Sequence, residues 1–385
     1  MKILFLAEFF YPHWTGYAQA TLRAALRLTE AGHECTVLAT RHDPALPPVE
    51  SYRGIVIHRA EPWLPISRTQ YSWDSLIQFS RLVGACDLIF LHTPHSNTLP
   101  FSLMAKIRRK PTLVFLHGDL ILPQGWHNRL LEKIFDFSMH LACRWAAAVS
   151  TSVRDYAEHS RILRHYLHKF HPLLLPMEMP QEAPDPEVTA LLTRLRQEKG
   201  AEALVGFAGR FVEEKAFDIL LQAVPLVVRE KPRVHFVYAG DFPHYEDFFQ
   251  RVQPLWDQSA QHLTHLGLLR GEGRMIAFFR HLDLFVLPSR SDCFAIVQAE
   301  AMSQGVPVVV TNIPGARWLV RTSGFGLLAE PEDPASLAAA ILDALTRGKA
   351  HFSGQETAMA FLHHRNFLQQ FNAIATAIFG SAKPG

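Results

Sequence analysis

Short apolar runs alternate with longer stretches of helical period along the whole chain. A first series of runs predicts strands at 2–7, 34–39, 55–60, 87–92, 112–117 and 146–151. A second series predicts strands at 203–209, 234–240, 263–269, 282–288, 306–311 and 326–330. Helical patterns lie between the runs, such as residues 17–31, which Gly32 ends. This alternation is typical of an α/β protein whose parallel sheets are covered by helices.

A segment dense in proline and acidic residues, 172–187, separates the two series and is interpreted as a linker. We therefore predict two domains of similar size, residues 1–178 and 179–359. The last helical stretch, 360–379, has no strand after it, and we expect the chain end, about 360–385, to cross back onto the first domain. Because ligands of open α/β sheets bind beyond the carboxyl ends of strands, two such domains facing each other would enclose a binding cleft.

The composition excludes several classes of protein. With 385 residues and 48% hydrophobic content the chain can bury a large core, which excludes a disordered or fibrous protein. A net charge of +2 gives no general case for nucleic-acid binding. The scattered cysteines lack metal-ligand spacing and predict reduced thiols in a cytoplasmic protein; they are Cys35, Cys86, Cys143 and Cys293. Glu8 interrupts the first apolar run too early for a signal peptide, and no run of about eighteen apolar residues predicts a membrane span.

The segment 206–227 joins a strand to a helix through a charged turn. Gly209-Arg210 ends the strand and Lys215 follows just before the helix. A guanidinium and an ammonium at such a joint suit a diphosphate. Spacing alone equally favours an exposed turn whose charges pair with Glu213 and Glu214.

The segment 289–305, SRSDCFAIVQAEAMSQG, predicts a helix from about Cys293 to Gln304, with Ser289, Ser291 and Asp292 as capping residues. Its first free N–H groups would form an anion site. Capping alone also explains Asp292. Glu300 lies among apolar residues, where a carboxylate is rarely buried without a partner, and it could accept hydrogen bonds from ribose hydroxyls.

Two further candidates lie in the first domain. His117 ends a predicted strand next to Gly118, where chemistry is expected in this architecture, although a lone histidine is more often structural. His92 and His95 end the preceding strand and favour a polar edge there. Thr15-Gly16, at the start of the first helix, would let backbone amides approach a phosphate, but it is not the G-x-G-x-x-G pattern of nicotinamide-binding proteins.

In this order the segments resemble the GT-B glycosyltransferases of family 4, retaining enzymes that use nucleotide-activated sugars. Thr15-Gly16 stands where the family has a Gly-Gly pair, and His117-Gly118 where it has an HG pair. Gly209-Arg210 and Glu214-Lys215 match its Gly-Arg and Glu-Lys pairs. Residues 288–309 match its pattern PSxxEGFGxxxxEAMAxGxPVV. The resemblance covers nearly the whole chain and implies the GT-B fold, two Rossmann-like domains facing across a cleft.

The resemblance also implies a site. Arg210 and Lys215 would hold the donor diphosphate, and Glu300 would bind the ribose. His117 and Asp292 would act beside the reacting sugar as catalytic residues. The full donor site implied is Gly16, Gly209, Arg210, Lys215, Leu268, Phe294, Ala295, Ile296, Val297 and Glu300. No metal ion or other cofactor is expected, and no D-x-D pattern stands in a suitable loop.

The chain departs from the family pattern near the donor sugar. Asp292 replaces a glutamate, Cys293 and Ala295 replace two glycines, and 173–180 lacks the Asn-Gly-Val-Asp turn. These differences would reshape the donor-sugar pocket. A UDP-sugar is the favoured donor, with a GDP-sugar next. The alternatives are a non-catalytic nucleotide-sugar-binding homologue, a GT-B sugar-nucleotide epimerase and a membrane scaffold.

The acceptor side is basic. Residues 101–175 hold eleven Lys or Arg and five Asp or Glu, a difference of +6. Within it, 154–175 combines bases with apolar residues, as would a surface helix that touches anionic lipid; a solvated basic helix face explains it equally. We expect a glycan, lipid-linked or small-molecule acceptor and a cytoplasmic location, with the inner face of the membrane as an alternative.

Overall fold

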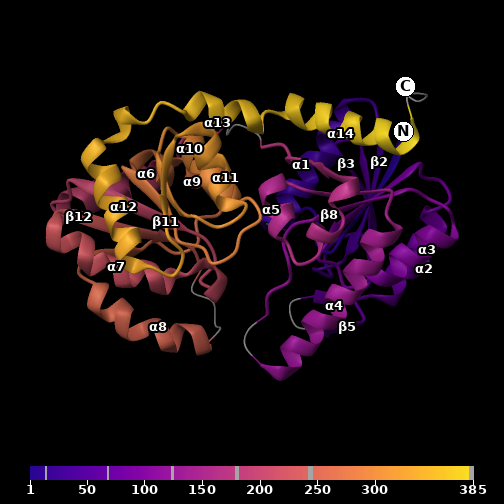
Figure 1. The fold of residues 1–385 in the computed structure, drawn as a ribbon, viewed down its shortest axis with the longest axis horizontal. Helices are drawn as coiled ribbons and strands as arrows, with labels where there is room; N and C mark the ends of the chain where they lie inside the picture. The colour runs from indigo at the N-terminus through magenta and orange to yellow at the C-terminus, as the bar shows by residue number, and fades with distance from the viewer. Residues whose placement is uncertain (14, 67–68, 123–124, 178–181, 242–245, 381–385) are drawn as a thin grey trace. The chain divides into compact units, whose positions relative to one another are not determined.

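The computed structural model describes residues 1–13, 15–66, 69–122, 125–177, 182–241 and 246–380. Contacts divide the chain into unit 1, residues 1–178 with 362–385, and unit 2, residues 179–361 (Figure 1). The predicted boundary after residue 178 and the last five residues of the predicted C-terminal segment lie outside the described residues.

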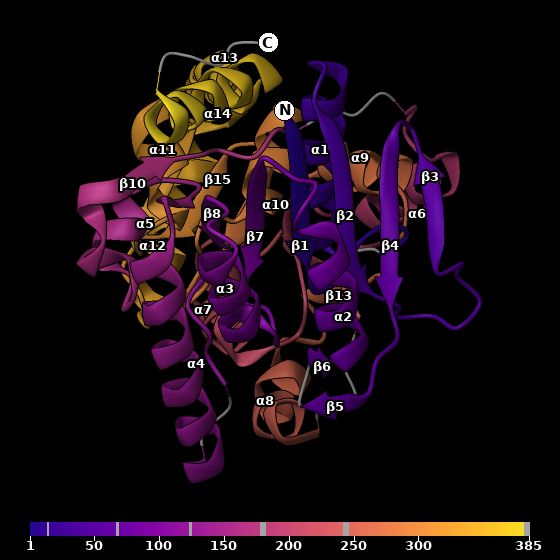
Figure 2. The same cartoon turned by 90° about the vertical axis from the view of Figure 1, so that its right-hand side faces the viewer.

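Unit 1 is built on an eight-stranded sheet in the order β10-β9-β8-β7-β1-β2-β4-β3, whose strands pair in parallel apart from β3 with β4 (Figure 2). Its strands are β1 (Lys2–Ala7), β2 (Glu34–Thr40), β3 (Val49–Tyr52), β4 (Ile55–Ala60), β7 (Leu88–Thr93), β8 (Thr112–Leu116), β9 (Ala148–Thr151) and β10 (Phe170–Pro172). A separate antiparallel pair, β5 (Leu64–Ile66) and β6 (Thr69–Tyr71), follows β4.

Helices cover both faces of this sheet. They are α1 (Gly16–Glu30), α2 (Trp73–Leu82), α3 (Thr98–Ile107), α4 (Trp126–Trp145), α5 (Arg154–His159), the short 3₁₀ turns η1 (Leu163–His165) and η2 (Leu167–Lys169), and α14 (His364–Phe379). The final helix α14 belongs to unit 1 because Phe371 packs in the same core cluster as Phe5 and Phe90. The amide of Leu174 also donates to the Gln370 side chain at 2.7 Å.

Unit 2 has a fully parallel six-stranded sheet in the order β13-β12-β11-β14-β15-β16. The strands are β11 (Ala203–Ala208), β12 (Val234–Ala239), β13 (Leu263–His265), β14 (Leu284–Leu287), β15 (Val308–Thr311) and β16 (Gly326–Ala329). The helices are α6 (Pro186–Glu198), η3 (Glu213–Lys215), α7 (Phe217–Glu230), α8 (Glu246–Ser259), α9 (Glu272–His281), α10 (Ile296–Ser303), α11 (Ala316–Ser323), α12 (Pro334–Arg347), η4 (Lys349–His351) and α13 (Gln355–Leu362).

Each sheet has a point where the strand order reverses direction. In unit 2 it lies between β11 and β14, and in unit 1 between β1 and β7. The loops that leave two such strands diverge to opposite sides, which leaves room for a ligand beyond their carboxyl ends. The order of the strands therefore singles out the loops after β11 and β14, and those after β1 and β7.

The predicted α/β class is confirmed. All twelve predicted strands are present and end within two residues of their predicted bounds, except that the run 263–269 is a strand only to His265. The strands missed are short: β3, β5, β6 and β10. The last helical stretch is not one helix, because α13 ends at Leu362 and α14 starts afresh with His363 as its capping residue.

The prediction of one surface helix over 154–175 is wrong. This segment folds as α5, η1, η2 and β10. Most of its apolar side chains lie in the core; for example, Ile162, Leu163, Leu173 and Leu174 are each at most 3% exposed. They are therefore unavailable to a lipid surface.

Candidate active site

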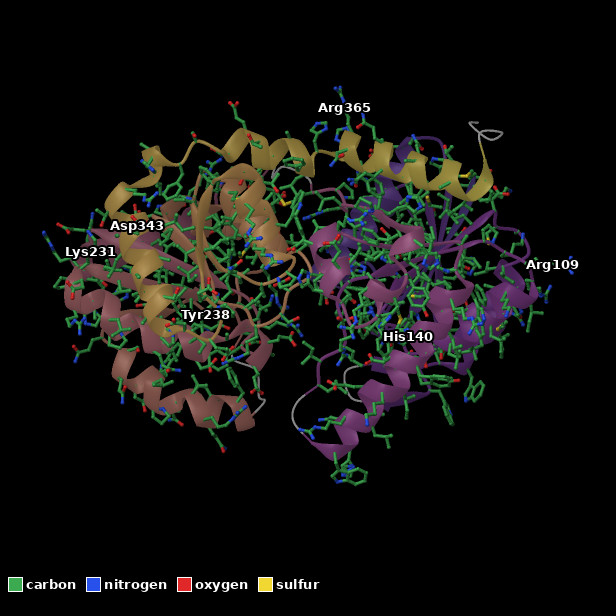
Figure 3. The ribbon with its side chains drawn as sticks, viewed as in Figure 1. Arg109, His140, Lys231, Tyr238, Asp343 and Arg365 are labelled. Atoms are coloured by element: carbon green, nitrogen blue, oxygen red, sulfur yellow. The ribbon has the colours of Figure 1, made fainter. Side chains whose placement is uncertain are left out.

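A buried tyrosine makes a hydrogen bond to the backbone of the turn after β11. The hydroxyl of Tyr238, labelled in Figure 3, donates to the carbonyl of Gly209 at 3.0 Å. A Cβ at Gly240 would lie 2.2 Å from the same carbonyl oxygen, so only glycine fits there. Burial raises the pKa of Tyr238, which keeps its hydroxyl a neutral donor. The hydrogen bond from Tyr238 and the close packing of Gly240 thus fix the position of the Gly209-Arg210 turn.

The loops after β11 and β14 meet through an ion pair. The ammonium of Lys215 lies 2.5 Å from Oδ2 of Asp292, and the two side chains are only 19% and 10% exposed. The pair joins positions 77 residues apart in the chain. The sequence interpretation that paired Lys215 with a neighbouring glutamate is therefore wrong, and the two predicted site residues lie in direct contact.

Arg290, which sequence reasoning passed over, holds this arrangement together. Its guanidinium makes two hydrogen bonds to the carboxylate of Asp218, at 2.8 and 2.7 Å, and one to the carbonyl of Glu213 at 2.7 Å. Glu332 adds an ion pair at 2.6 Å. The carboxylates raise the pKa of Arg290. Through these contacts Arg290, which lies in the loop after β14, fixes the position of η3, the 3₁₀ turn that contains Lys215.

The helix after this loop begins later than predicted. It starts at Ile296 rather than Cys293, and its first capping position is Ala295 in a left-handed conformation with φ of 58°. Asp292 caps the preceding turn instead, because its Oδ1 accepts the amide of Ala295 at 2.7 Å. One of the amides predicted to be free for an anion is therefore occupied by Asp292.

The other predicted donor residues are less enclosed. Arg210 is 61% exposed and pairs with Glu214 at 2.5 Å, as the alternative interpretation of that turn predicted. Glu300 is half-buried on α10 rather than fully buried. Leu268, in the loop after β13, is 45% exposed. The four predicted donor-binding residues around the start of α10 differ in burial. Phe294 and Ala295 are buried, whereas Ile296 and Val297 are half-buried.

The corresponding edge of unit 1 carries paired histidines. Nε2 of His117 lies 2.8 Å from Nδ1 of His92, and the ring of Tyr17 packs 4.5 Å from that of His117. Burial lowers the pKa of His117 to about 3, and burial followed by the charge on His117 lowers that of His92. Both imidazoles are therefore neutral near pH 7, and a single N–H lies between them.

The hydrogen-bond partners of His92 indicate which of its two ring nitrogens carries the proton. The Thr21 hydroxyl donates to the carbonyl of Tyr17 at 2.9 Å, so it is free to accept from Nδ1 of His92, 3.3 Å away. Nε2 of His92 is buried and has no hydrogen-bond partner among the described residues. These contacts place the proton on Nδ1 of His92, between the Thr21 hydroxyl and Nε2 of His117, the nearer of the two acceptors.

The remaining predicted positions of unit 1 lie near the same edge. Glu8, at the end of β1, accepts the amide of Ser96 at 2.9 Å and lies 3.4 Å from the His95 ring. Gly16 is the first residue of α1, and Thr15 caps that helix. A Cβ at Gly16 would meet nothing within 4 Å, so protein packing does not require glycine there.

Across the described part of the chain, no group of three or more His, Cys, Asp or Glu side chains is arranged to hold a metal ion. Within that same part, no helix has the length and apolar character needed to cross a bilayer.

Two family models match the chain, one in each unit. Residues 202–347 match the model described as glycosyl transferases group 1, and residues 15–165 match the glycosyl transferase 4-like domain. The chain belongs to the group 1 glycosyltransferases. Lys215, Asp292 and Glu300 lie within the first match, and His117 lies within the second.

Curated relatives of this family are moderately similar. The mannosylfructose-phosphate synthase of Agrobacterium fabrum is 24% identical over 69% of this chain and 57% of its own length. A D-inositol 3-phosphate glycosyltransferase of Xylanimonas cellulosilytica is 26% identical over 72% and 62%, and the D-rhamnosyltransferase WbpZ of Pseudomonas aeruginosa 25% over 78% and 74%. The chain thus spans less than two thirds of the length of the mannosylfructose-phosphate synthase and of the D-inositol 3-phosphate glycosyltransferase.

Solved glycosyltransferase structures share the GT-B fold along nearly the whole chain. Anabaena Alr3699/HepE in complex with UDP and glucose superposes with a TM-score of 0.75 at 20% identity, covering 98% of this chain and 100% of that one. Sucrose-phosphate synthase of Thermosynechococcus elongatus gives 0.74 at 16% identity, covering 99% and 100%. The predicted GT-B fold class is thereby confirmed.

Proposed function

We propose that this group 1 glycosyltransferase is a retaining enzyme that moves a sugar from a nucleotide-diphosphate donor to a glycan, lipid-linked or small-molecule acceptor. A UDP-sugar is the favoured donor, with a GDP-sugar next. The observation that carries the proposal is the Lys215–Asp292 ion pair, which lies where the strand order of unit 2 reverses. The complex of HepE with UDP-glucose, on the same fold, supports the choice of base.

In the proposal, Lys215 and Arg210 bind the donor diphosphate. Arg210 is exposed, and an exposed ion pair such as that with Glu214 is worth about 1 kcal/mol or less, so a phosphate can replace the glutamate at little cost. Asp292, next to Lys215, is left to accept hydrogen bonds from donor-sugar hydroxyls. Glu300 is proposed to bind the ribose hydroxyls, which a carboxylate accepts in pairs.

The bond changes assign a task to these cations. The bond from the sugar C1 to the diphosphate oxygen breaks, and a bond from C1 to the acceptor oxygen forms on the same face. The acceptor proton passes to a departing phosphate oxygen. Fixed cations beside the departing diphosphate stabilise its growing charge, an effect commonly worth several kcal/mol. The proposal includes no metal ion, and the roles of His117, Gly16 and Leu268 stay predictions from the resemblance.

The test begins with thermal unfolding of the chain in the presence of UDP, GDP, ADP and TDP. We expect UDP to raise the unfolding temperature of wild type and to have a much smaller effect on Lys215→Ala. No stabilisation by any of the four nucleotides would contradict the donor site and favour a scaffold role.

Product analysis then separates the remaining functions. Incubation with UDP-sugars and candidate acceptors should release UDP and form a glycosylated product with retained anomeric configuration. Binding with neither release nor conversion would indicate a non-catalytic homologue. Conversion of the donor sugar without acceptor would indicate an epimerase.

A further inference from the structure

The first half of helix α4 exposes an apolar stripe. Trp126, Leu130, Ile134 and Phe137 are 72%, 52%, 54% and 61% exposed. The helix extends out of unit 1 at this end (Figure 2), and its fully buried residues, such as Met139, lie in its second half. Surface positions normally hold such large apolar side chains singly rather than in rows.

The stripe has a defined direction on the helix. At about 100° per residue, its four side chains fall within roughly 80° of one another and point nearly opposite to Met139. The helix therefore has one apolar face toward the core of unit 1 and a second, the α4 stripe, directed away from it. Folding of unit 1 explains the first face only.

The acidic and basic residues next to the α4 stripe differ in their contacts. The acidic residues Glu132 and Asp136 turn toward Arg161, at 3.9 and 3.2 Å, and Glu132 also accepts the amide of Leu122 at 2.7 Å. Arg129 and Lys133 are exposed, and no ion pair to either is present among the described residues. The charge that borders the α4 stripe is therefore positive.

We propose that the α4 stripe is a docking surface for an anionic lipid bilayer. An interfacial helix buries Trp, Phe and Leu side chains at the headgroup boundary while Lys and Arg contact anionic headgroups. The stripe spans twelve residues, so its ends lie about 17 Å apart along the helix axis, which suits a helix lying in the interface. The surrounding segment 101–175 has a charge of +6, whereas the whole chain has +2.

A second copy of the chain is a poorer occupant. In a symmetric dimer the same patch meets itself, so two α4 stripes would bring Arg129 and Lys133 close to their own copies. Like charges brought together in this way oppose association. An anionic surface instead complements both the bases and the apolar side chains.

Vesicle flotation tests the proposal with the full chain. Wild type should float with vesicles of phosphatidylcholine and phosphatidylglycerol, bind phosphatidylcholine alone much more weakly, and detach as salt rises. The double variant Trp126→Gln/Phe137→Gln should bind the mixed vesicles about tenfold more weakly or worse. Arg129→Gln/Lys133→Gln should lose about tenfold or more and become less sensitive to salt.

A matched control removes apolar surface elsewhere in unit 1. Val49 and Val56 are exposed on β3 and β4, at the sheet edge far from β8 and β9, which α4 connects. Val49→Thr/Val56→Thr should bind vesicles like wild type. The far-ultraviolet circular dichroism and the thermal unfolding temperature of every variant should match wild type, since none of the four α4 side chains lies in the core.

Several outcomes would overturn the proposal. They are absence of wild-type flotation with mixed vesicles, undiminished flotation of Trp126→Gln/Phe137→Gln, and an equal loss in the β3–β4 control. A concentration-dependent dimer that the α4 substitutions abolish, without vesicle binding by wild type, would assign the stripe to a second copy instead.

Discussion

The carboxyl edges of the two sheets are built from opposite kinds of polar group. In unit 2 the loops after β11 and β14 and the first turn of α7 hold full charges in pairs, Lys215 with Asp292 and Arg290 with Asp218. In unit 1, His92 near the end of β7 and His117 directly after β8 are kept neutral by burial, which lowers the pKa of both. The same architecture therefore carries a charged edge suited to a diphosphate and a neutral edge suited to hydrogen bonding.

Pairing with an opposite charge, together with solvent access, explains the difference. The charged side chains of unit 2 keep part of their surface in water, with Lys215 and Arg290 19% and 26% exposed. His92 is fully buried, so a charge there would lose its hydration. We therefore expect the edge of unit 2 to control ligand affinity, and the edge of unit 1 to control how stability depends on pH.

The largest expected effect is loss of transfer in Lys215→Ala. Removal of the ammonium takes away a cation that would stabilise the departing diphosphate, and such groups contribute about a hundredfold to a thousandfold in rate. Turnover of the donor should fall by at least this factor, and the circular dichroism spectrum should be unchanged.

Lys199→Ala provides the matched control, because Lys199 is an exposed lysine of the same unit at the end of α6. It should turn over donor like wild type. Turnover near the wild-type rate in Lys215→Ala would remove the charged edge from the mechanism.

The sequence predicted the fold well because each central strand has a local signal. Runs such as 203–209 are apolar throughout, as expected of strands buried on both faces. The edge strand β3 has the sequence VESY with alternating exposure, and β10 contains Pro172, so neither carries that signal. Short edge strands depend on the partner strand more than on their own residues.

The candidate site was predicted less completely, because pairing is not local. Lys215 and Asp292 were each singled out, yet their contact depends on β11 and β14 being neighbours in the sheet. Arg290 stood inside the predicted capping segment, and its carboxylate partner Asp218 lies 72 positions away. The start of α10 was misplaced because Asp292 caps an isolated turn that the sequence cannot distinguish from a helix start.

The second prediction concerns pH. The folded pKa of His117 is about 3, and the unfolded value is near 6.5, so the unfolded state binds more protons between them. This contribution to stability is complete above pH 6.5 and is lost as pH falls toward 3. At about pH 5, protonation of His117 in the unfolded state should by itself lower the free energy of unfolding by about 2 kcal/mol. Denaturant midpoints of wild type measured at neutral pH and at pH 5 should show the fall.

Substitution isolates this contribution from those of other histidines. His117→Gln should reduce the difference between the two midpoints, whereas His168→Gln, at an exposed position of the same unit, should leave it unchanged. An undiminished pH dependence in His117→Gln would mean that the edge of unit 1 does not control acid stability.

The third prediction concerns the Arg290 clamp. Arg290→Met should lower the free energy of unfolding by about 1–2 kcal/mol, because Asp218 loses a two-pronged, partly exposed partner. It should also weaken UDP binding, since η3 is no longer fixed to the loop after β14. A double-mutant cycle with Asp218→Asn checks the pairing: strictly additive losses would contradict it.

The smallest expected effect concerns backbone strain at the charged edge. Ala295 has a φ of 58°, a left-handed conformation that costs a residue with a Cβ about 1–2 kcal/mol, whereas the edge of unit 1 has Gly118 beside His117. Ala295→Gly relieves this strain, which offsets the loss of the buried methyl group and the added flexibility of the unfolded chain. Ala299→Gly, at an equally buried position inside α10, relieves none. Denaturant unfolding should therefore find Ala295→Gly more stable than Ala299→Gly by about 1 kcal/mol, and equal losses would mean that position 295 stores no strain.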